Sequence, residues 1–240
     1  MNLRAPSRLA FTHIPRRLWA GGYNYQSNLF AALSKFRPGE FAPVLFAGTG
    51  DDDADLAPLA AIPGVEVVRS AAFEGRAGLA AALALGLDRE AATEFRTNRI
   101  DVVFESARFF GWRLPYPAIA WFPDFQHRRL PQLFPAAARW RREAGFRMQI
   151  ASGRTIMLSS ESSHRDFRTF YPGANSKVCV VRFATQPSPA STKPTRSSLC
   201  MRTQPTSDTI APSSRNLGRA ESEAAAEAEA SVIRFASRLY

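Results

Sequence analysis

An acid and a histidine, three residues apart, follow an apolar run near the middle of the chain. Residues 119–122 are apolar, Pro123 ends the run, and Asp124 and His127 come directly after it. A carboxylate and an imidazole can orient hydroxyl groups or move a proton, since histidine titrates near neutral pH. A strand over the apolar run would carry both side chains to the edge where open α/β sheets bind ligands. The alternative is structural: Asp124 caps the following turn and His127 bonds to the backbone.

The elements that would position this pair form a repeating pattern of apolar runs and helical segments. Expected strands cover residues 8–14, 41–48, 65–68, 101–106, 118–122, 155–160 and 177–183. Expected helices cover residues 24–33, 78–96, 136–148 and 161–171. Continuous apolar strands that alternate with helices are typical of a parallel sheet covered on both faces. The sequence therefore predicts an α/β, Rossmann-like domain over residues 1–183.

The composition changes after residue 183. In residues 184–207, 14 of 24 residues are Ser, Thr or Pro, and no apolar period remains. Such a segment buries too little surface to offset its ordering entropy. Residues 184–240 are accordingly predicted to be a low-complexity, disordered tail.

The bulk properties narrow the class of protein. A net charge of +10 fits nucleic acid, an anionic membrane surface or a phosphorylated ligand, and equally a general bias toward arginine. The arginines are scattered and no recognised nucleic-acid motif is present, so a nucleic-acid partner is not expected. Cys179 and Cys200 offer neither a disulfide framework nor metal spacing. No apolar run reaches the roughly 18 residues of a membrane span, and a cytoplasmic location is expected.

Further candidate residues lie where strands end and helices begin. Gly21 and Gly22 are expected at the turn from the first strand to the first helix, where backbone amides favour an anion. Glu105 closes the fourth strand, and Ser160 and Glu161 open a helix after the sixth. The structural alternatives are a plain turn for the glycines and helix capping for Ser160. Three consecutive acids at residues 51–53 point in different directions, which favours a cap or a solvated loop over a metal site.

Three blocks of this sequence resemble glycosyltransferase family 4, whose members have the GT-B fold. The first is WAGGYNY at residues 19–25, followed by Asn28 and Leu29. The second is FPDFQH at residues 122–127, followed by Leu130 and Pro131. The third begins at SSE in residues 159–161 and continues through Asp166, Tyr171, Pro172 and residues 177–180. The blocks stand in the family's order and span roughly residues 8–183.

The resemblance implies two Rossmann-like domains facing across a cleft, of which this chain matches the N-terminal, acceptor-side one. The family transfers a sugar from a nucleotide-sugar, its donor substrate, to a saccharide or lipid-linked acceptor, and needs no cofactor or bound metal. Asp124 and His127 are then the catalytic candidates. The implied substrate contacts are Gly21, Gly22, Asn24, Tyr25, Glu105, Arg128, Ser160 and Glu161.

The match to the family stops just after Phe183, where a donor-binding turn and an acidic pair would be expected in the next domain. This departure suggests a truncated or frame-shifted product that is weakly active or inactive alone. The competing hypothesis is a non-catalytic Rossmann-like module that binds a ligand or a partner. The basic helix around Trp140 could touch an anionic membrane at the inner face of the plasma membrane, or simply pack on the sheet.

Overall fold

A seven-stranded parallel sheet forms the centre of the protein. The computed structural model describes residues 5–106 and 108–182. Neighbouring strands follow the order β3-β2-β1-β4-β5-β6-β7, and every neighbouring pair is parallel. The strands are β1 Ser7–Thr12, β2 Phe41–Ala47, β3 Glu66–Arg69, β4 Val102–Glu105, β5 Ala118–Phe122, β6 Thr155–Leu158 and β7 Val178–Val180.

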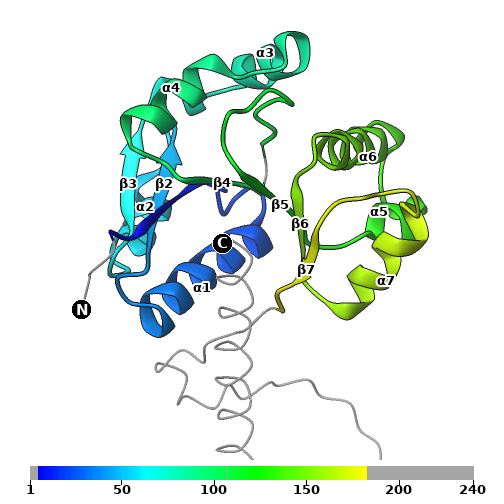
Figure 1. Cartoon of the computed structure of the whole chain (residues 1–240), viewed down its shortest axis with the longest axis horizontal. Coiled ribbons are helices and arrows are strands. Elements are labelled where there is room, and N and C mark those ends of the chain that lie inside the picture. The colour runs from blue at the N-terminus through cyan, green and yellow to red at the C-terminus, as the bar shows by residue number, and fades with distance from the viewer. Residues whose placement is uncertain (1–4, 107, 183–240) are drawn as a thin grey trace, which may run out of the picture.

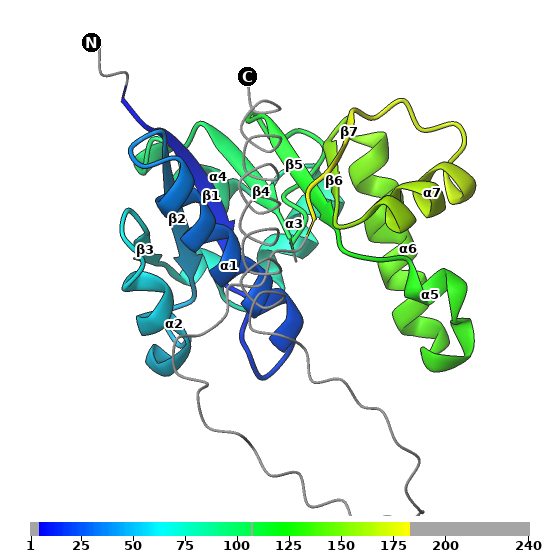
Figure 2. The same ribbon diagram turned by 90° about the horizontal axis from the view of Figure 1, so that it is seen from below.

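Helices cover both faces of this sheet, as Figures 1 and 2 show. One face carries α1 (Ala20–Phe36) and α2 (Asp53–Ala60). The other carries α3 (Ala77–Leu85), α4 (Arg89–Thr97), α6 (Ala136–Ala151) and α7 (Glu161–Phe170). The short α5 (Gln126–Arg129) and two 3-10 turns, Ala71–Phe73 and Pro131–Leu133, complete the described elements.

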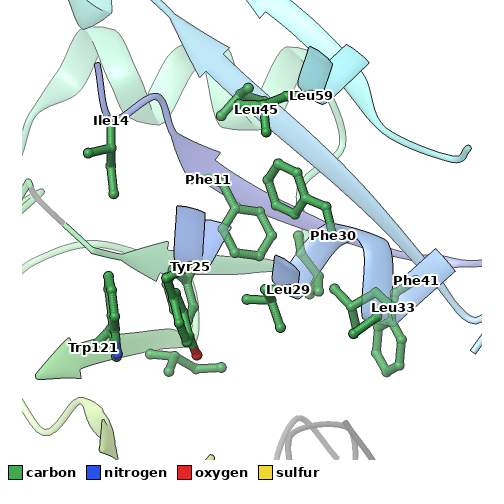
Figure 3. Close-up of a cluster of buried hydrophobic side chains, with 14 of the residues drawn as sticks. Phe11, Ile14, Tyr25, Leu29, Phe30, Leu33, Phe41, Leu45, Leu59 and Trp121 are labelled. Atoms are coloured by element: carbon green, nitrogen blue, oxygen red, sulfur yellow. The ribbon is translucent and has the colours of Figure 1, made fainter. Parts of the chain in front are cut away.

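The core follows from the two-residue period of each strand. In β1, Leu9 and Phe11 face the α1 side, whereas Ala10 faces the α4 side. Phe11 meets Phe30 of α1 edge to face, with ring centroids 4.8 Å apart (Figure 3). Strands β4 and β5 are buried along their whole length. This two-sided burial explains the continuous apolar runs and confirms the predicted α/β, Rossmann-like sheet.

Two differences from the predicted helices bear on the site residues and on the turn between α3 and α4. The first helix begins at Ala20 rather than residue 24, so Gly21 and Gly22 lie inside its first turn and not in the preceding loop. The expected helix over residues 78–96 is two helices. Gly86 ends α3 in the left-handed conformation (φ +80°), and the Asp88 side chain caps α4 by accepting from Ala91 N at 3.1 Å.

The acidic cluster at residues 51–53 lies at the start of a helix. Asp52 caps α2, accepting from Ala54 N at 2.9 Å, which confirms the cap alternative for the acidic cluster. The sequence interpretation missed α2 and α5. No described helix is both long and apolar enough to cross a membrane. The predicted tail, residues 184–240, lies outside the described residues, and the boundary at 183 stays a prediction.

Candidate functional site

The strand order reverses between β1 and β4, and this reversal marks the crevice where such sheets bind ligands. Strands β2 and β3 extend the sheet to one side of β1, while β4 to β7 extend it to the other. His13 follows β1, and Glu105 is the last residue of β4. The Asp124–His127 segment follows β5 and so lies one strand beyond the reversal.

Trp121 of β5, the residue before the second block, contacts both the first and the third of the blocks that carry the expected family resemblance. Its ring stacks on Tyr25 at 4.0 Å between centroids and on Trp19 at 5.3 Å. Figure 3 shows the rings of Tyr25 and Trp121 side by side. The indole Nε1 of Trp121 donates to Ser159 Oγ at 2.9 Å. Residues from the segments after β1 and β6 thus meet on one side chain of β5.

A second set of contacts joins the segments after β5 and β6. Arg129 forms an ion pair with Asp166 of α7, and its Nε donates to Asp166 Oδ1 at 3.0 Å. The hydroxyl of Ser163 donates to the carbonyl of Pro123 at 3.4 Å. The blocks after β5 and β6 therefore form one continuous surface at the carboxyl edge of the sheet.

The glycine pair after β1 serves the packing of a tryptophan. A Cβ on Gly22 would lie 2.3 Å from the Trp19 ring, so only glycine admits that ring. Gly21 and Asn24 are exposed on the first turns of α1. Trp19, at the N-cap, makes no side-chain capping hydrogen bond, so the first amides of α1 have no side-chain cap and can face an anion.

Tyr25 lies in the core rather than on the rim. It is 5% exposed, and its hydroxyl donates to Met157 Sδ at 3.8 Å. Burial raises the pKa of Tyr25, and the nearby Cys179 adds to the rise. The Tyr25 ring stacks on the Trp121 ring, so its contacts are packing contacts within the core.

Asp124 and His127 are held by different residues of α6. Asp124 Oδ1 accepts from Gln126 N at 3.0 Å and pairs with Arg142 at 3.2 Å. His127 Nε2 lies 3.4 Å from Glu143 Oε2. No hydrogen bond joins Asp124 to His127 in the described structure. The cap alternative for Asp124 is therefore realised, while its carboxylate stays about one-third exposed.

Glu143 is the centre of the cluster around His127. Its carboxylate accepts from Arg128 Nε at 2.8 Å, Arg147 Nε at 2.6 Å and the Tyr171 hydroxyl at 2.9 Å. Burial alone would raise the pKa of Glu143, but these hydrogen bonds outweigh it and lower the pKa to about 2. Arg128, expected to meet substrate, is thus occupied by an internal carboxylate.

His127 is buried, at 4% exposure. Burial first, and then the positive charge of Arg142, lowers the pKa of His127. Its Nδ1 is buried and has no hydrogen-bond partner among the described residues. A shallow cavity of about 300 Å³ adjoins the ring, lined by His127, Arg128, Ala136, Arg139, Trp140 and Glu143.

Glu105 is a buried structural anchor. Its side chain is 0% exposed, and it pairs with the equally buried Arg154 at 3.1 Å. It also accepts from Phe110 N at 3.1 Å and from Gln149 Nε2 at 3.4 Å. Burial raises the pKa of Glu105 despite the charge of Arg154. The carboxylate fastens the loop after β4 and presents no oxygen to a ligand.

Ser160 and Glu161 open α7. Ser160 Oγ accepts from Ser163 N at 3.0 Å, which confirms its capping role. Glu161 is exposed and pairs loosely with Arg182 at 3.7 Å and His164 at 3.9 Å. Glu161 therefore presents its carboxylate at the surface.

The structure adds a histidine–carboxylate pair that the sequence interpretation missed. His13 Nδ1 lies 2.8 Å from Asp51 Oδ2, which also accepts from Gly48 N at 3.0 Å. The His13 side chain is 1% exposed, and its Nε2 has no partner among the described residues. The sequence does contain a hint of this pair. His13 follows β1 and Asp51 comes shortly after β2, and these two strands are neighbours in the sheet, so their carboxyl ends lie side by side.

In residues 5–106 and 108–182, no group of three or more His, Cys, Asp or Glu side chains could hold a metal ion. No protein-family model matches the chain, and no curated protein matches it either.

Proposed function

We propose that the chain is the acceptor-binding half of a family 4 glycosyltransferase. The full enzyme would transfer a sugar from a nucleotide-sugar to a saccharide or lipid-linked acceptor. The observation that supports this proposal is the meeting of all three family-like blocks at one edge of the sheet. Trp121 contacts Trp19 and Tyr25 of the first block and Ser159 of the third. Every segment that follows a strand of a parallel sheet reaches this edge, so the support lies in the direct side-chain contacts among these segments and not in the shared edge alone.

The exposed groups at this edge suit a sugar and an anion. The Asp124 carboxylate, held in place by Arg142, can accept from acceptor hydroxyls. The first amides of α1 can face the diphosphate that leaves the donor, because a helix N-terminus favours negative charge. His127 is too buried to reach substrate directly, so its role is to hold the segment after β5 against Glu143.

Saccharide titrations of the purified chain test acceptor binding. Ligand-observed NMR with a panel of mono- and disaccharides should give saturable binding by the wild type. Asn24→Ala and Asp124→Asn should each weaken it about tenfold, as loss of a hydrogen bond to a charged or polar partner does. Arg165→Gln changes an exposed helical arginine on α7 and is the control. Absence of saturable binding to the whole panel, or an equal loss in the control, would overturn the proposal.

A non-catalytic ligand-binding module is the second candidate. It is favoured by the internal contacts of the catalytic candidates, since His127 and Arg128 both contact Glu143. Incubation of the chain with nucleotide-sugar and a bound acceptor tests for transfer, and glycosylated product would support the transferase. Saturable saccharide binding without product fits the acceptor-binding half, which is expected to be weakly active or inactive alone. Saturable binding of ligands other than saccharides would support the module. With a lipid-linked acceptor, the protein would act at the inner face of the plasma membrane, where arginines of α6 meet anionic lipid.

A further inference from the structure

A cavity of about 530 Å³ lies between α3 and α6, and none of its described lining residues belongs to the three family-like blocks, although Trp121 directly precedes the second. Both helices lie on the same face of the sheet (Figure 1), and the segment just after β4 lines the space between them. The volume is within the range of about 300–1,000 Å³ that small-molecule sites occupy.

The lining of this cavity is mostly apolar. Leu79 and Leu83 come from α3, Phe109 from the segment after β4, and Phe146 and Met148 from α6. At the mouth, Leu83 is 43% exposed and Trp140 is 72% exposed. Exposed large apolar side chains beside a concave apolar space are typical of a binding site.

The polar part of the lining is entirely basic or neutral. Arg108, Arg141 and Arg142 line the cavity, and none of the described residues that line it is acidic. Arg108 pairs with Asp88 at 2.6 Å and Arg142 with Asp124 at 3.2 Å. For Arg141, which is exposed, the described part of the chain supplies no carboxylate partner. One positive charge at the cavity is therefore uncompensated.

A buried hydroxyl adds a second polar contact. Ser106 Oγ lines the cavity and has no hydrogen-bond partner among the described residues. Buried hydroxyl groups normally have a partner, because an unsatisfied one costs free energy. A ligand that fills the cavity can supply it.

We propose that the cavity between α3 and α6 binds an amphipathic organic anion. Its apolar part lies against Leu79, Leu83 and Phe146, and its phosphate or carboxylate pairs with Arg141. A guanidinium suits either group because it can donate two parallel hydrogen bonds. A neutral sugar would leave the apolar lining unused, and inorganic phosphate would not fill the volume. This site is independent of the glycosyltransferase proposal.

Gly145 provides a variant that fills the cavity without disturbing the fold. It lines the cavity in the middle of α6, and a Cβ built on it meets no atom within 4 Å. Gly145→Leu should therefore occupy ligand space at little structural cost. Gly173, whose added Cβ also meets nothing within 4 Å, supplies the matched control Gly173→Leu.

Calorimetric titration with decyl phosphate below its micelle concentration tests the site. The wild type should bind saturably, with decanol and inorganic phosphate at least tenfold weaker. Gly145→Leu should abolish binding, and Arg141→Gln should weaken it about tenfold. Gly173→Leu and Arg165→Gln should bind as the wild type does. Equal affinity for decanol, unchanged binding by Gly145→Leu, or no binding by the wild type would overturn the proposal.

A second arm distinguishes a free anion from a bilayer lipid. Vesicles of phosphatidylglycerol, compared with phosphatidylcholine, are sedimented with the same variants. Adsorption that is lost in Gly145→Leu would identify a lipid headgroup with its chain as the source and would support the site. Decyl phosphate binding without vesicle adsorption would identify a free amphiphile and support it equally. If Gly145→Leu still adsorbed to the vesicles and decyl phosphate did not bind the wild type, the cavity would not be the binding site.

Discussion

Two buried histidines at the carboxyl edge are each held by a carboxylate, yet the two pairs differ in kind. His13 meets Asp51 at 2.8 Å, and among the described residues that Asp51 oxygen accepts one further hydrogen bond, from the backbone of Gly48. His127 meets Glu143 at 3.4 Å, and Glu143 also accepts from two arginines and a tyrosine. Asp51 is therefore free to orient its histidine, whereas Glu143 mainly anchors arginines.

The region around His13 has a ring nitrogen with no partner among the described residues, whereas in the region around His127 the charged groups bond to one another. The pair at the strand reversal leaves Nε2 of His13 without a described partner at the position where Rossmann-like sheets bind ligands. The cluster between α5, α6 and α7 instead uses its charges to fasten three helices together. The proposed resemblance to family 4 points to the second region, but the geometry gives the first region the better-oriented imidazole.

The largest effect is expected at Glu105, between the two regions. Glu105→Ala would leave Arg154 buried at 6% exposure without its carboxylate. Loss of one partner of a buried ion pair costs about 3–5 kcal/mol. Urea denaturation should show a correspondingly lower midpoint. The double variant Glu105→Leu/Arg154→Leu is the control, since removal of both charges should restore part of the loss. A single variant as stable as the wild type would contradict the anchoring role.

The next largest effect is a difference in stability between alanine substitutions at two glycines, Gly22 in α1 and Gly145 in α6. Gly22→Ala puts a Cβ 2.3 Å from the Trp19 ring and should lower the free energy of unfolding by about 1–3 kcal/mol through overpacking. Gly145→Ala in α6 meets no atom and should raise it by about 0.5–1 kcal/mol through helix propensity. Thermal unfolding of both variants shows whether the stability falls in the first and rises in the second. Equal shifts would show that Trp19 does not depend on Gly22.

A smaller, pH-dependent effect is expected for Glu143. Its pKa is about 2 in the folded protein and about 4.3 in an unfolded chain. The unfolded state therefore takes up the proton first, and the contribution of Glu143 is present above about pH 4.3 and disappears as the pH falls toward 2. The stability difference between wild type and Glu143→Gln should shrink over that interval. A difference that stays constant from pH 6 to pH 2 would contradict the network.

The sequence predicted the sheet well because β4 and β5 are buried along their whole length and β2 along most of it, and these strands read as apolar runs. The edge strand β3 is only partly buried and was recognised from its short Val-Val core after a turn. It also predicted the cap at Ser160, and it gave a cap as one of two alternatives for the acids at 51–53, of which Asp52 is the one that caps. Such caps depend on neighbours two or three residues away. It could not reveal contacts between distant segments. Glu105 looks like a rim residue until Arg154, 49 residues later, is seen beside it. Glu143, one acid among the arginines of α6, gave no sign that four groups converge on it.

The finest test of the comparison is the position of one proton on each ring. Nδ1 of His13 faces Asp51, so the neutral ring should carry its proton there, whereas His127 should carry it on Nε2, which faces Glu143. Long-range ¹H–¹⁵N NMR spectra distinguish these tautomers. Asp51→Asn should disturb the tautomer of His13 alone. Arg142→Gln should leave His13 unchanged and raise the pKa of His127, because a nearby positive charge is removed. If both rings carried the proton on the same nitrogen, Asp51 and Glu143 could not be orienting them as the distances indicate.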